Sequence, residues 1–235
     1  MVRLTAAAGE RNAVLVSAQG TTVLVEERGL ATLTSDGTCA ISGRVANCGS
    51  GVLAVVVALG DKQDQLLTST QPVPPGLPVT ADGGDGDDTL QDQPGDDTIA
   101  GGPGDDVVFD TSGGRDRYSG GDGRDTIAYP GTGDVHVSAD GVADDGLAGE
   151  GDDVAPDFED LQGGDGDDVL SGTGAPNTIT GGPGDDFVSG AGAADVLDGG
   201  DGRDTLVGGD GPDGLSGGDA DDLLYGQGGG DTLVG

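Results

Sequence analysis

The sequence predicts an all-β protein assembled from short repeats, and three observations support this fold class. From Gly83 onward the chain falls into units of nine residues. Each unit keeps one apolar residue or tyrosine at its eighth position, preceded by a run of turn-forming residues. Gly and Pro make up about a quarter of the 235 residues, Trp is absent, and Phe and Tyr number three each. Such a chain lacks the residues of an ordinary globular core, so a periodic fold is the natural alternative to disorder.

The net charge limits the functions that this chain can serve. Asp and Glu total 44 against 9 Lys and Arg, which gives a formal charge of −35. This charge argues against nucleic acids, anionic membranes and acidic substrates as partners. No apolar run reaches the length of a transmembrane helix, and the amino-terminal segment shows no signal-peptide pattern. Two interpretations remain: an acidic disordered chain, or a repeat protein whose carboxylates meet cations.

Residues 1–80 precede the repeats and are expected to form a β-rich cap on the amino-terminal end of the stack. The strand-like runs are Ala13–Ser17, Thr21–Glu26, Thr38–Ile41 and Val52–Leu59, and Thr68–Thr80, with four prolines, is an extended linker or edge. The only cysteines are Cys39 and Cys48. A disulfide between them would close a hairpin-like loop and would fit an oxidising compartment. Free thiols or a metal pair are the alternatives, although a zinc site would lack a nearby His.

The repeats form two blocks. Residues 83–128 hold five units, with one extra residue, Asp110, after the third, and residues 163–234 hold eight units without interruption. The sixth position is Asp in twelve of the thirteen units, and Asn177 is the exception. The eighth positions are Leu90, Ile99, Val108, Tyr118, Ile127, Leu170, Ile179, Val188, Leu197, Leu206, Leu215, Leu224 and Leu233. A disordered chain has no reason to keep this period, so the period favours a folded stack.

The residue types within a unit indicate a cation site. Side chains of a strand alternate between its two faces, so the eighth residue points inward while the seventh and ninth point outward. Stacked turns would place the sixth-position carboxylates roughly 5 Å apart. Such neighbours repel by roughly 3 kcal/mol per pair at an effective dielectric constant of 20. A hard cation between the turns would offset this repulsion, and Asp carboxylates with Gly carbonyls form an all-oxygen site that suits calcium.

The nonapeptide GGxGxDxUx, in which U is apolar, resembles the calcium-binding repeats of the RTX family, also called hemolysin-type repeats. The resemblance implies a right-handed parallel β-roll, a β-solenoid in which two successive units make one coil. It also implies that several Ca²⁺ ions bind between stacked turns and that the metal-free chain is largely unfolded. The metal-site residues that we assign on this basis are Gly83, Asp85, Gly86, Asp88, Asp97, Gly101, Pro103, Gly104, Asp106, Asp116, Gly120, Asp122, Gly123, Asp125, Gly163, Asp165, Gly166, Asp168, Gly181, Pro183, Gly184, Asp186, Asp195, Gly199, Asp201, Gly202, Asp204, Asp213, Asp222 and Asp231.

Units two apart lie on the same edge of such a roll, and the two edges differ in sequence. On the first edge every unit opens with Gly-Gly, and the sixth positions are Asp88, Asp106 and Asp125, then Asp168, Asp186, Asp204 and Asp222. On the second edge the openings vary, and the sixth positions are Asp97 and Asp116, then Asn177, Asp195, Asp213 and Asp231. We expect calcium to fill the first edge first, with roughly five ions, and the second edge with up to roughly four. The sites beside Asn177 should be the weakest. The alternative is that the glycine variation is neutral and both edges bind alike.

The two blocks are separated by an acidic insert, residues 129–162. Asp134–Ser138 alternates as a strand does, and acidic residues follow it. One interpretation is an extra, loop-built calcium site with Asp140, Asp145 and Glu150 among its ligands. The other is a solvated acidic loop, since the spacing does not match an EF-hand.

No catalytic residues are predicted. The chain has one His, His136, so the HExxH motif cannot occur, and the GxSxG string around Ser216 lies within a repeat unit rather than at a strand-to-helix elbow. The sequence therefore predicts a non-enzymatic, extracellular module, secreted or on the cell surface, with a structural or secretion-linked role. The alternative is the calcium-binding piece of a larger secreted hydrolase, toxin or adhesin, because Gly235 begins a new unit. End-to-end self-association is a further possibility for an uncapped coil.

Overall fold

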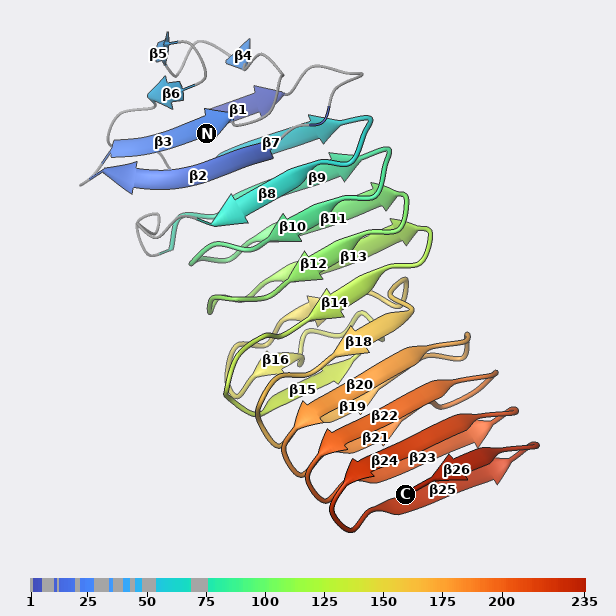
Figure 1. Cartoon of the computed structure of the whole chain (residues 1–235). Coiled ribbons are helices and arrows are strands. Elements are labelled where there is room, and N and C mark those ends of the chain that lie inside the picture. The colour runs from blue at the N-terminus through green and yellow to red at the C-terminus, as the bar shows by residue number, and fades with distance from the viewer. Residues whose placement is uncertain are drawn as a thin grey trace. The chain divides into compact units, whose positions relative to one another are not determined.

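The computed structural model describes residues 2–5, 11, 13–19, 22–27, 34–35, 40–42, 45–47, 54–68 and 76–235. These residues form strands, turns and bends, with no helix among them, so the prediction of an all-β fold is confirmed (Figure 1). Nowhere among them is there a helix with the length and apolarity that crossing a membrane requires. The chain divides into two compact units, Met1–Asp125 and Thr126–Gly235.

The first unit is a β-solenoid in which alternate strands stack in parallel into two sheets. One sheet has the order β13-β11-β9-β7-β1-β4, and the other has the order β12-β10-β8-β2-β3-β6-β5. The strands are β1 (Val2–Thr5), β2 (Ala13–Gln19), β3 (Thr22–Glu27), β4 (Thr34–Ser35), β5 (Ala40–Ser42), β6 (Val45–Asn47), β7 (Val55–Gly60), β8 (Gln65–Thr68), β9 (Val79–Gly84), β10 (Thr89–Gln91), β11 (Thr98–Pro103), β12 (Val107–Phe109) and β13 (Arg117–Asp122).

The register keeps equivalent repeat positions opposite one another. Leu90 lies opposite Val108, the eighth position two units further along the chain. Ile99 lies opposite Tyr118, again the eighth position two units further along, because the extra residue Asp110 is absorbed between the two strands. The period read from the sequence therefore sets the strand register. Some strands have the expected three residues, as in β10, but others have six, as in β11, which runs from the seventh position of one unit to the third position of the next.

Parallel stacking also extends to strands that precede the first repeat. β7 pairs with β9 and β8 with β10, and further back β1 pairs with β7 and β2 with β8. The strands β3 to β6 pair in antiparallel fashion and lie at the amino-terminal end of the two sheets. Strands β2, β3, β5 and β7 overlap the runs predicted from the sequence. Cys39 and Cys48 lie outside the described residues, so their disulfide stays a prediction.

The second unit is again a parallel β-solenoid. One sheet has the order β26-β24-β22-β20-β18-β14, and the other has the order β16-β15-β19-β21-β23-β25. The strands are β14 (Thr126–Ala128), β15 (Val135–Ser138), β16 (Gly146–Leu147), β17 (Asp153–Val154), β18 (Asp160–Gln162), β19 (Val169–Ser171), β20 (Thr178–Pro183), β21 (Phe187–Ser189), β22 (Val196–Asp201), β23 (Thr205–Asp210), β24 (Gly214–Asp219), β25 (Leu223–Gly228) and β26 (Thr232–Val234).

The acidic insert contributes one coil to this second solenoid. Its strand β15, predicted from the sequence, pairs in parallel with β19, and β18 pairs in parallel with β14 and β20. Residues 139–159 leave the coil between these strands and carry β16 and β17. The insert is therefore a coil with an excursion rather than a break in the stack.

The eighth-position side chains form the core of both units. Strand alternation turns them inward, and eleven of the thirteen are at most 2 % exposed: Leu90, Ile99, Val108, Tyr118, Ile127, Leu170, Ile179, Val188, Leu197, Leu206 and Leu215. Leu233, in the last strand, is 45 % exposed. The eighth-position side chains thus form one column in each of the two sheets of a unit, and these columns make up most of the core of the repeats.

Candidate metal centre

The sixth-position carboxylates are buried where each turn meets its strand. Asp106 and Asp125 are fully buried, and Asp88, Asp186 and Asp204 are at most 3 % exposed. Successive members are linked, because Oδ1 of one carboxylate accepts a hydrogen bond from the backbone N–H of the sixth residue one coil earlier. The distance is 2.7 Å from the Asp88 nitrogen to Asp106 and 2.9 Å from the Asp186 nitrogen to Asp204. The backbone thereby fixes the position of the carboxylates in the column.

The second oxygen of many of these carboxylates has no hydrogen-bond partner although it is buried. These orphaned Oδ2 atoms belong to Asp88, Asp106, Asp186, Asp195, Asp204, Asp213 and Asp222. A buried anionic oxygen without a partner is expensive, so each of them calls for a positively charged partner.

The first glycine of these turns leaves the orphaned oxygens accessible within the stack. A Cβ added to Gly83 would lie 2.2 Å from Asp88 Oδ2 and 2.6 Å from the carbonyl oxygen of Gly101, one coil further on. At Gly181 the corresponding distances to Asp186 Oδ2 and the Gly199 carbonyl oxygen are 2.2 and 2.7 Å. Glycine is therefore required at this position, and carboxylate and carbonyl oxygens converge where a side chain would otherwise stand.

The surroundings of these carboxylates disfavour a negative charge that is not balanced. Burial raises the pKa of Asp88 and Asp186 to about 7 and that of Asp106 and Asp195 to about 6. Neighbouring carboxylates add to this effect, with Asp106 acting on Asp88 and Asp204 acting on Asp186. A cation bound at the column would stabilise the ionised carboxylates that burial otherwise disfavours.

The possible ligands are hard oxygen atoms, from carboxylates and backbone carbonyls. Such ligands suit calcium better than they suit softer metals. Four stretches of the chain match the family model of the RTX calcium-binding nonapeptide repeat, at residues 82–109, 110–128, 162–197 and 198–233. The chain belongs to the RTX calcium-binding repeat family. RTX repeats are structural, calcium-binding elements, and the orphaned oxygens of this chain fit such an ion. No curated protein is significantly similar to this chain.

The RTX turns of this chain adopt two conformations, which differ at the second residue of the unit. We call a turn open when the φ of this residue lies in the left-handed region, as at Gly84 (96°), Gly102 (116°) and Gly200 (114°). We call a turn closed when it does not. The closed turns have Gln93, Ser112, Gly164 and Thr173 at the second position.

Turn conformation and hydrogen bonding go together. Every orphaned sixth-position Oδ2 named above belongs to an open turn. In three closed turns the second residue's backbone N–H instead donates to the sixth residue's side chain, at 2.8 Å in each case: Gln93 to Asp97, Gly164 to Asp168 and Thr173 to Asn177. In the fourth, Tyr118 Oη donates to Asp116 Oδ2. The closed turns therefore satisfy their carboxylate or amide with the protein's own donors.

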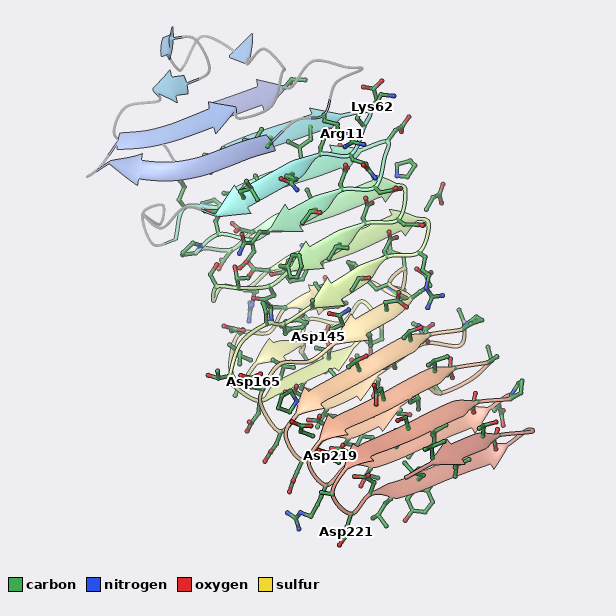
Figure 2. The ribbon with its side chains drawn as sticks, in the orientation of Figure 1. Arg11, Lys62, Asp145, Asp165, Asp219 and Asp221 are labelled. Carbon is green, nitrogen blue, oxygen red and sulfur yellow. The ribbon has the colours of Figure 1, made fainter. Side chains whose placement is uncertain are left out.

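The third-position residues that the sequence assigned to the metal site lie outside the buried column. Asp85, Asp122 and Asp201 are exposed, as are Pro103 and Pro183. Asp165 and Asp219 likewise project from the turns (Figure 2). Their backbone carbonyls hold the coils together, for example Asp122 O, which accepts a bond of 2.8 Å from Gly104 N. The structure thus separates exposed third-position side chains from buried sixth-position ones.

Sequence reasoning missed a second acidic ladder at the fifth position, where the side chains are exposed. Asp87 Oδ1 accepts from Asp105 N at 3.2 Å, and Asp105 Oδ1 accepts from Arg124 N at 3.0 Å. In the second unit Asp185 accepts from Arg203 N and forms an ion pair with the Arg203 side chain, and these bonds lower the pKa of Asp185. Arginine therefore replaces aspartate along this ladder and offsets its charge.

Sequence reasoning also missed Asp64, which extends the sixth-position column before the first recognised repeat. Asp64 is 1 % exposed, and its backbone N–H donates to Asp88 Oδ1 at 2.7 Å. Lys62 takes the place of the fourth-position glycine of this coil, and Gly86 packs directly on the Lys62 carbonyl. The available signal was the spacing of Asp64 and buried Leu66, which matches the sixth and eighth positions of a repeat.

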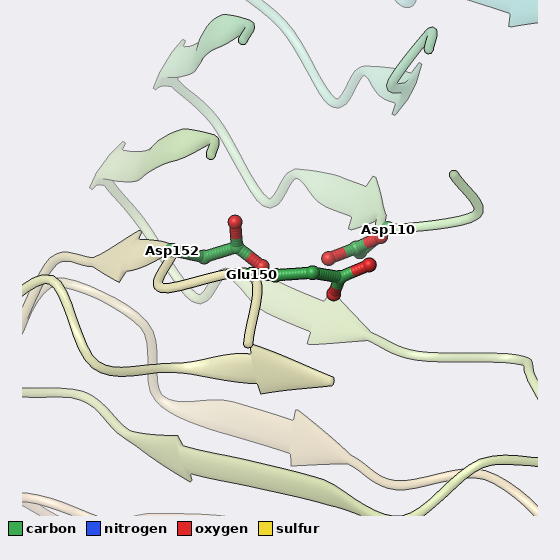
Figure 3. Close-up of side chains that lie close together, drawn as sticks. All are labelled: Asp110, Glu150 and Asp152. Atoms are coloured by element: carbon green, nitrogen blue, oxygen red, sulfur yellow. The ribbon is translucent and has the colours of Figure 1, made fainter. Parts of the chain in front are cut away.

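The three acidic residues proposed for the insert have separate roles. Asp145 is buried and accepts from the Ser138 and Val154 backbones at 2.6 and 3.0 Å, while burial raises its pKa to about 6. Asp140 accepts from Val142 N, and Glu150 accepts from Leu147 N. Glu150 also lies beside Asp152, and a carboxylate oxygen of Glu150 is within 4.8 Å of one of Asp152 (Figure 3).

Proposed function

We propose that this chain is an extracellular calcium-binding module that folds when several Ca²⁺ ions bind between its stacked turns. The observation that carries this proposal is the column of buried Oδ2 atoms in the open turns, each without a protein donor. The residues that would hold the ions are the sixth-position aspartates of these turns, together with turn carbonyls such as that of Gly101. A bound ion would supply the positive charge that lets neighbouring carboxylates stack while ionised.

The proposed extracellular role rests on calcium availability. Extracellular calcium is in the millimolar range and can fill weak sites, whereas cytosolic calcium cannot. With a net charge of −35, the chain would repel itself and stay largely unfolded without the ion, then become rigid on export. A structural or secretion-linked role follows from such a switch.

A far-ultraviolet circular dichroism titration, from chelator into millimolar calcium, tests this proposal. We expect a cooperative transition from coil to β structure with calcium and little response to magnesium at the same concentration, because Mg²⁺ is smaller and dehydrates reluctantly. A spectrum that does not respond to calcium would rule out the folding switch.

A further inference from the structure

Two closed turns, which begin at Asp92 and Thr111 on the second edge of the first repeat block, depart from the RTX pattern in the same way. We propose that this edge takes no calcium and is instead held by a hydrogen-bonded clamp made of Asp92, Thr111 and Ser112. The proposal deepens the calcium-binding function, on which it rests, by stating which turns of the first block bind the ion.

Asp92 is the centre of the clamp. It is fully buried, and its carboxylate accepts four hydrogen bonds from the opening of the turn one coil further on. Oδ1 accepts from the backbone N–H and the hydroxyl of Thr111, both at 2.7 Å. Oδ2 accepts from the backbone N–H and the hydroxyl of Ser112, at 3.0 and 2.7 Å. Both oxygens are thus fully engaged by neutral donors, as in a carboxylate built to be satisfied by the protein alone.

The sixth-position carboxylates of this edge are satisfied in the same way. Asp97 accepts from Val79 N at 2.7 Å and from Gln93 N at 2.8 Å. Asp116 accepts from Asp97 N at 2.7 Å and from Tyr118 Oη at 3.3 Å. On the other edge of the same block, the Oδ2 atoms of Asp88 and Asp106 have no such donor. A cation at the clamp edge would have to displace these donors and leave them buried without a partner.

The backbone and the available space agree with this assignment. In the open turns the first residue must be glycine, because a Cβ on Gly83 or Gly101 would come within 2.3 Å of a carboxylate oxygen. At the clamp edge the first residues are Asp92 and Thr111, which carry side chains where the open turns have glycine. The second residues, Gln93 and Ser112, also lack the left-handed φ of the open turns.

The consequence is a first block with one calcium-dependent edge and one calcium-independent edge. The clamp keeps the turns at residues 92–97 and 111–116 together when calcium is scarce, so that the strands they join are in register before the ions arrive. In chelator these two turns should exchange their amide hydrogens more slowly than the turns at residues 83–88 and 101–106.

Two measurements on the full-length chain test this clamp: bound calcium counted by native mass spectrometry, and amide hydrogen exchange read by peptide mass. The double variant Thr111→Val/Ser112→Ala removes two donors to Asp92 and touches no sixth-position residue. We expect its calcium count to equal that of the parent chain. We also expect exchange at residues 92–97 and 111–116 in chelator to be faster by about tenfold. Asp106→Asn, on the opposite edge, is the matched control and should lower the calcium count while leaving clamp exchange unchanged.

A gain-of-site variant provides the converse test. Replacing Asp92, Gln93, Thr111 and Ser112 by glycine gives both turns the Gly-Gly opening of the first edge, and we expect the calcium count to rise by at least one. The clamp proposal is overturned if Thr111→Val/Ser112→Ala loses ions as Asp106→Asn does, or if a folded glycine variant gains none. If the parent chain binds no calcium, the proposed function fails, and slow clamp exchange in chelator still decides whether the clamp exists.

Discussion

The second edges of the two repeat blocks look equally degraded in the sequence, yet their turns differ. In the first block the second positions, Gln93 and Ser112, have left the left-handed conformation. In the second block Thr173 has left it too, but Ala191 keeps it at φ 72° and Gln227 at φ 65°. The sixth-position side chains follow this division. Asp97 is satisfied by backbone donors, whereas Asp195 keeps a buried Oδ2 without a partner.

This difference shows that losing a turn glycine has two outcomes. Alanine offers no hydrogen bond, so at Ala191 and Ala193 the turn retains the RTX backbone at a steric cost of about 1–2 kcal/mol per residue. The side chains of Asp, Thr and Ser can form hydrogen bonds. At Asp92, Thr111 and Ser112, hydrogen bonds between neighbouring coils take the place of the turn conformation that leaves a carboxylate oxygen free for an ion. At these positions the outcome differs with the side chain that replaces glycine, so the absence of glycine alone does not decide whether a turn remains suited to calcium.

Removing calcium should cause the largest loss of folded structure, and a lower pH should partly restore it. Burial raises the pKa of Asp88 and Asp186 to about 7 and that of Asp106 and Asp195 to about 6, against about 3.9 in the unfolded chain. Because the folded state binds these protons more tightly, it gains stability that is fully present below about pH 4 and is lost as pH rises through about 6 to 7. In chelator, circular dichroism should therefore show β structure in acid that disappears toward neutral pH. Calcium should restore it there, and a metal-free stability that rises with pH would contradict this linkage.

Substitution of turn glycines should have the next largest effect, which should depend on the position of the glycine within the turn. In Gly101→Ala the new Cβ would lie 2.3 Å from Asp106 Oδ2 and 2.6 Å from the Gly120 carbonyl oxygen. We expect a loss of about 1–3 kcal/mol in urea unfolding at saturating calcium, together with weaker calcium binding. Gly174→Ala, in a closed turn with no atom within 4 Å of the new Cβ, is the control and should change stability by less than about 0.5 kcal/mol. Equal effects of the two substitutions would contradict this dependence on position.

The substitution Asn177→Asp has one expected outcome from the repeat pattern and the opposite outcome from the hydrogen bonds in the structure. The substitution restores the sixth-position aspartate, so the pattern alone predicts a new calcium ligand. In the structure Asn177 Nδ2 donates to Glu159 O at 3.0 Å, and Oδ1 accepts from Thr173 N. A carboxylate cannot make the first of these bonds, so we expect thermal unfolding to report a loss of about 1–3 kcal/mol and no added ion. Asp213→Asn, in an open turn, should lose an ion instead, and a stabilised Asn177→Asp with an extra ion would favour the pattern.

The smallest expected effect comes from relieving strain on the second edge of the second block. Ala191→Gly and Ala193→Gly remove a Cβ from residues at φ 72° and 73°, and each should raise stability in calcium by about 1 kcal/mol. Ala175→Gly, in the closed turn of Asn177, should lower it by about 0.5–1 kcal/mol through chain entropy alone. Urea unfolding at saturating calcium measures both, and a loss of stability at Ala191 would show that its turn is unstrained.

Much of the fold could be predicted because the repeat itself carries the register. The eighth-position residues, from Leu90 to Leu215, and the extra residue Asp110 are visible in the sequence. The alternation of side chains along a strand then predicts which of them point into the core. The coils before Gly83 could not be recognised. In the coil that ends in Asp64 only the second position keeps its glycine, Gly60 at φ 127°. Asp64 also precedes Asp88 by 24 positions, whereas Asp88 precedes Asp106 by 18.

Whether an individual turn is open or closed could not be predicted from the sequence either. The unit that opens at Gly163 has the full GGDGDD opening, yet its turn is closed and Asp168 accepts from Val135 N and Gly164 N. The reason is its neighbour, because Gly164 packs on the carbonyls of Tyr129 and Gly131 in the insert rather than on another repeat turn. A turn's conformation thus depends on the coil beneath it as well as on its own nine residues.

A crystal structure of the chain grown in calcium, with anomalous difference density collected for the ion, tests the central claim most directly. The account predicts ions beside the orphaned oxygens of Asp88, Asp106, Asp186, Asp195, Asp204, Asp213 and Asp222, and none at the closed turns of Asp97, Asp116, Asp168 and Asn177. Ions at the closed turns, or open turns without ions at saturating calcium, would contradict it.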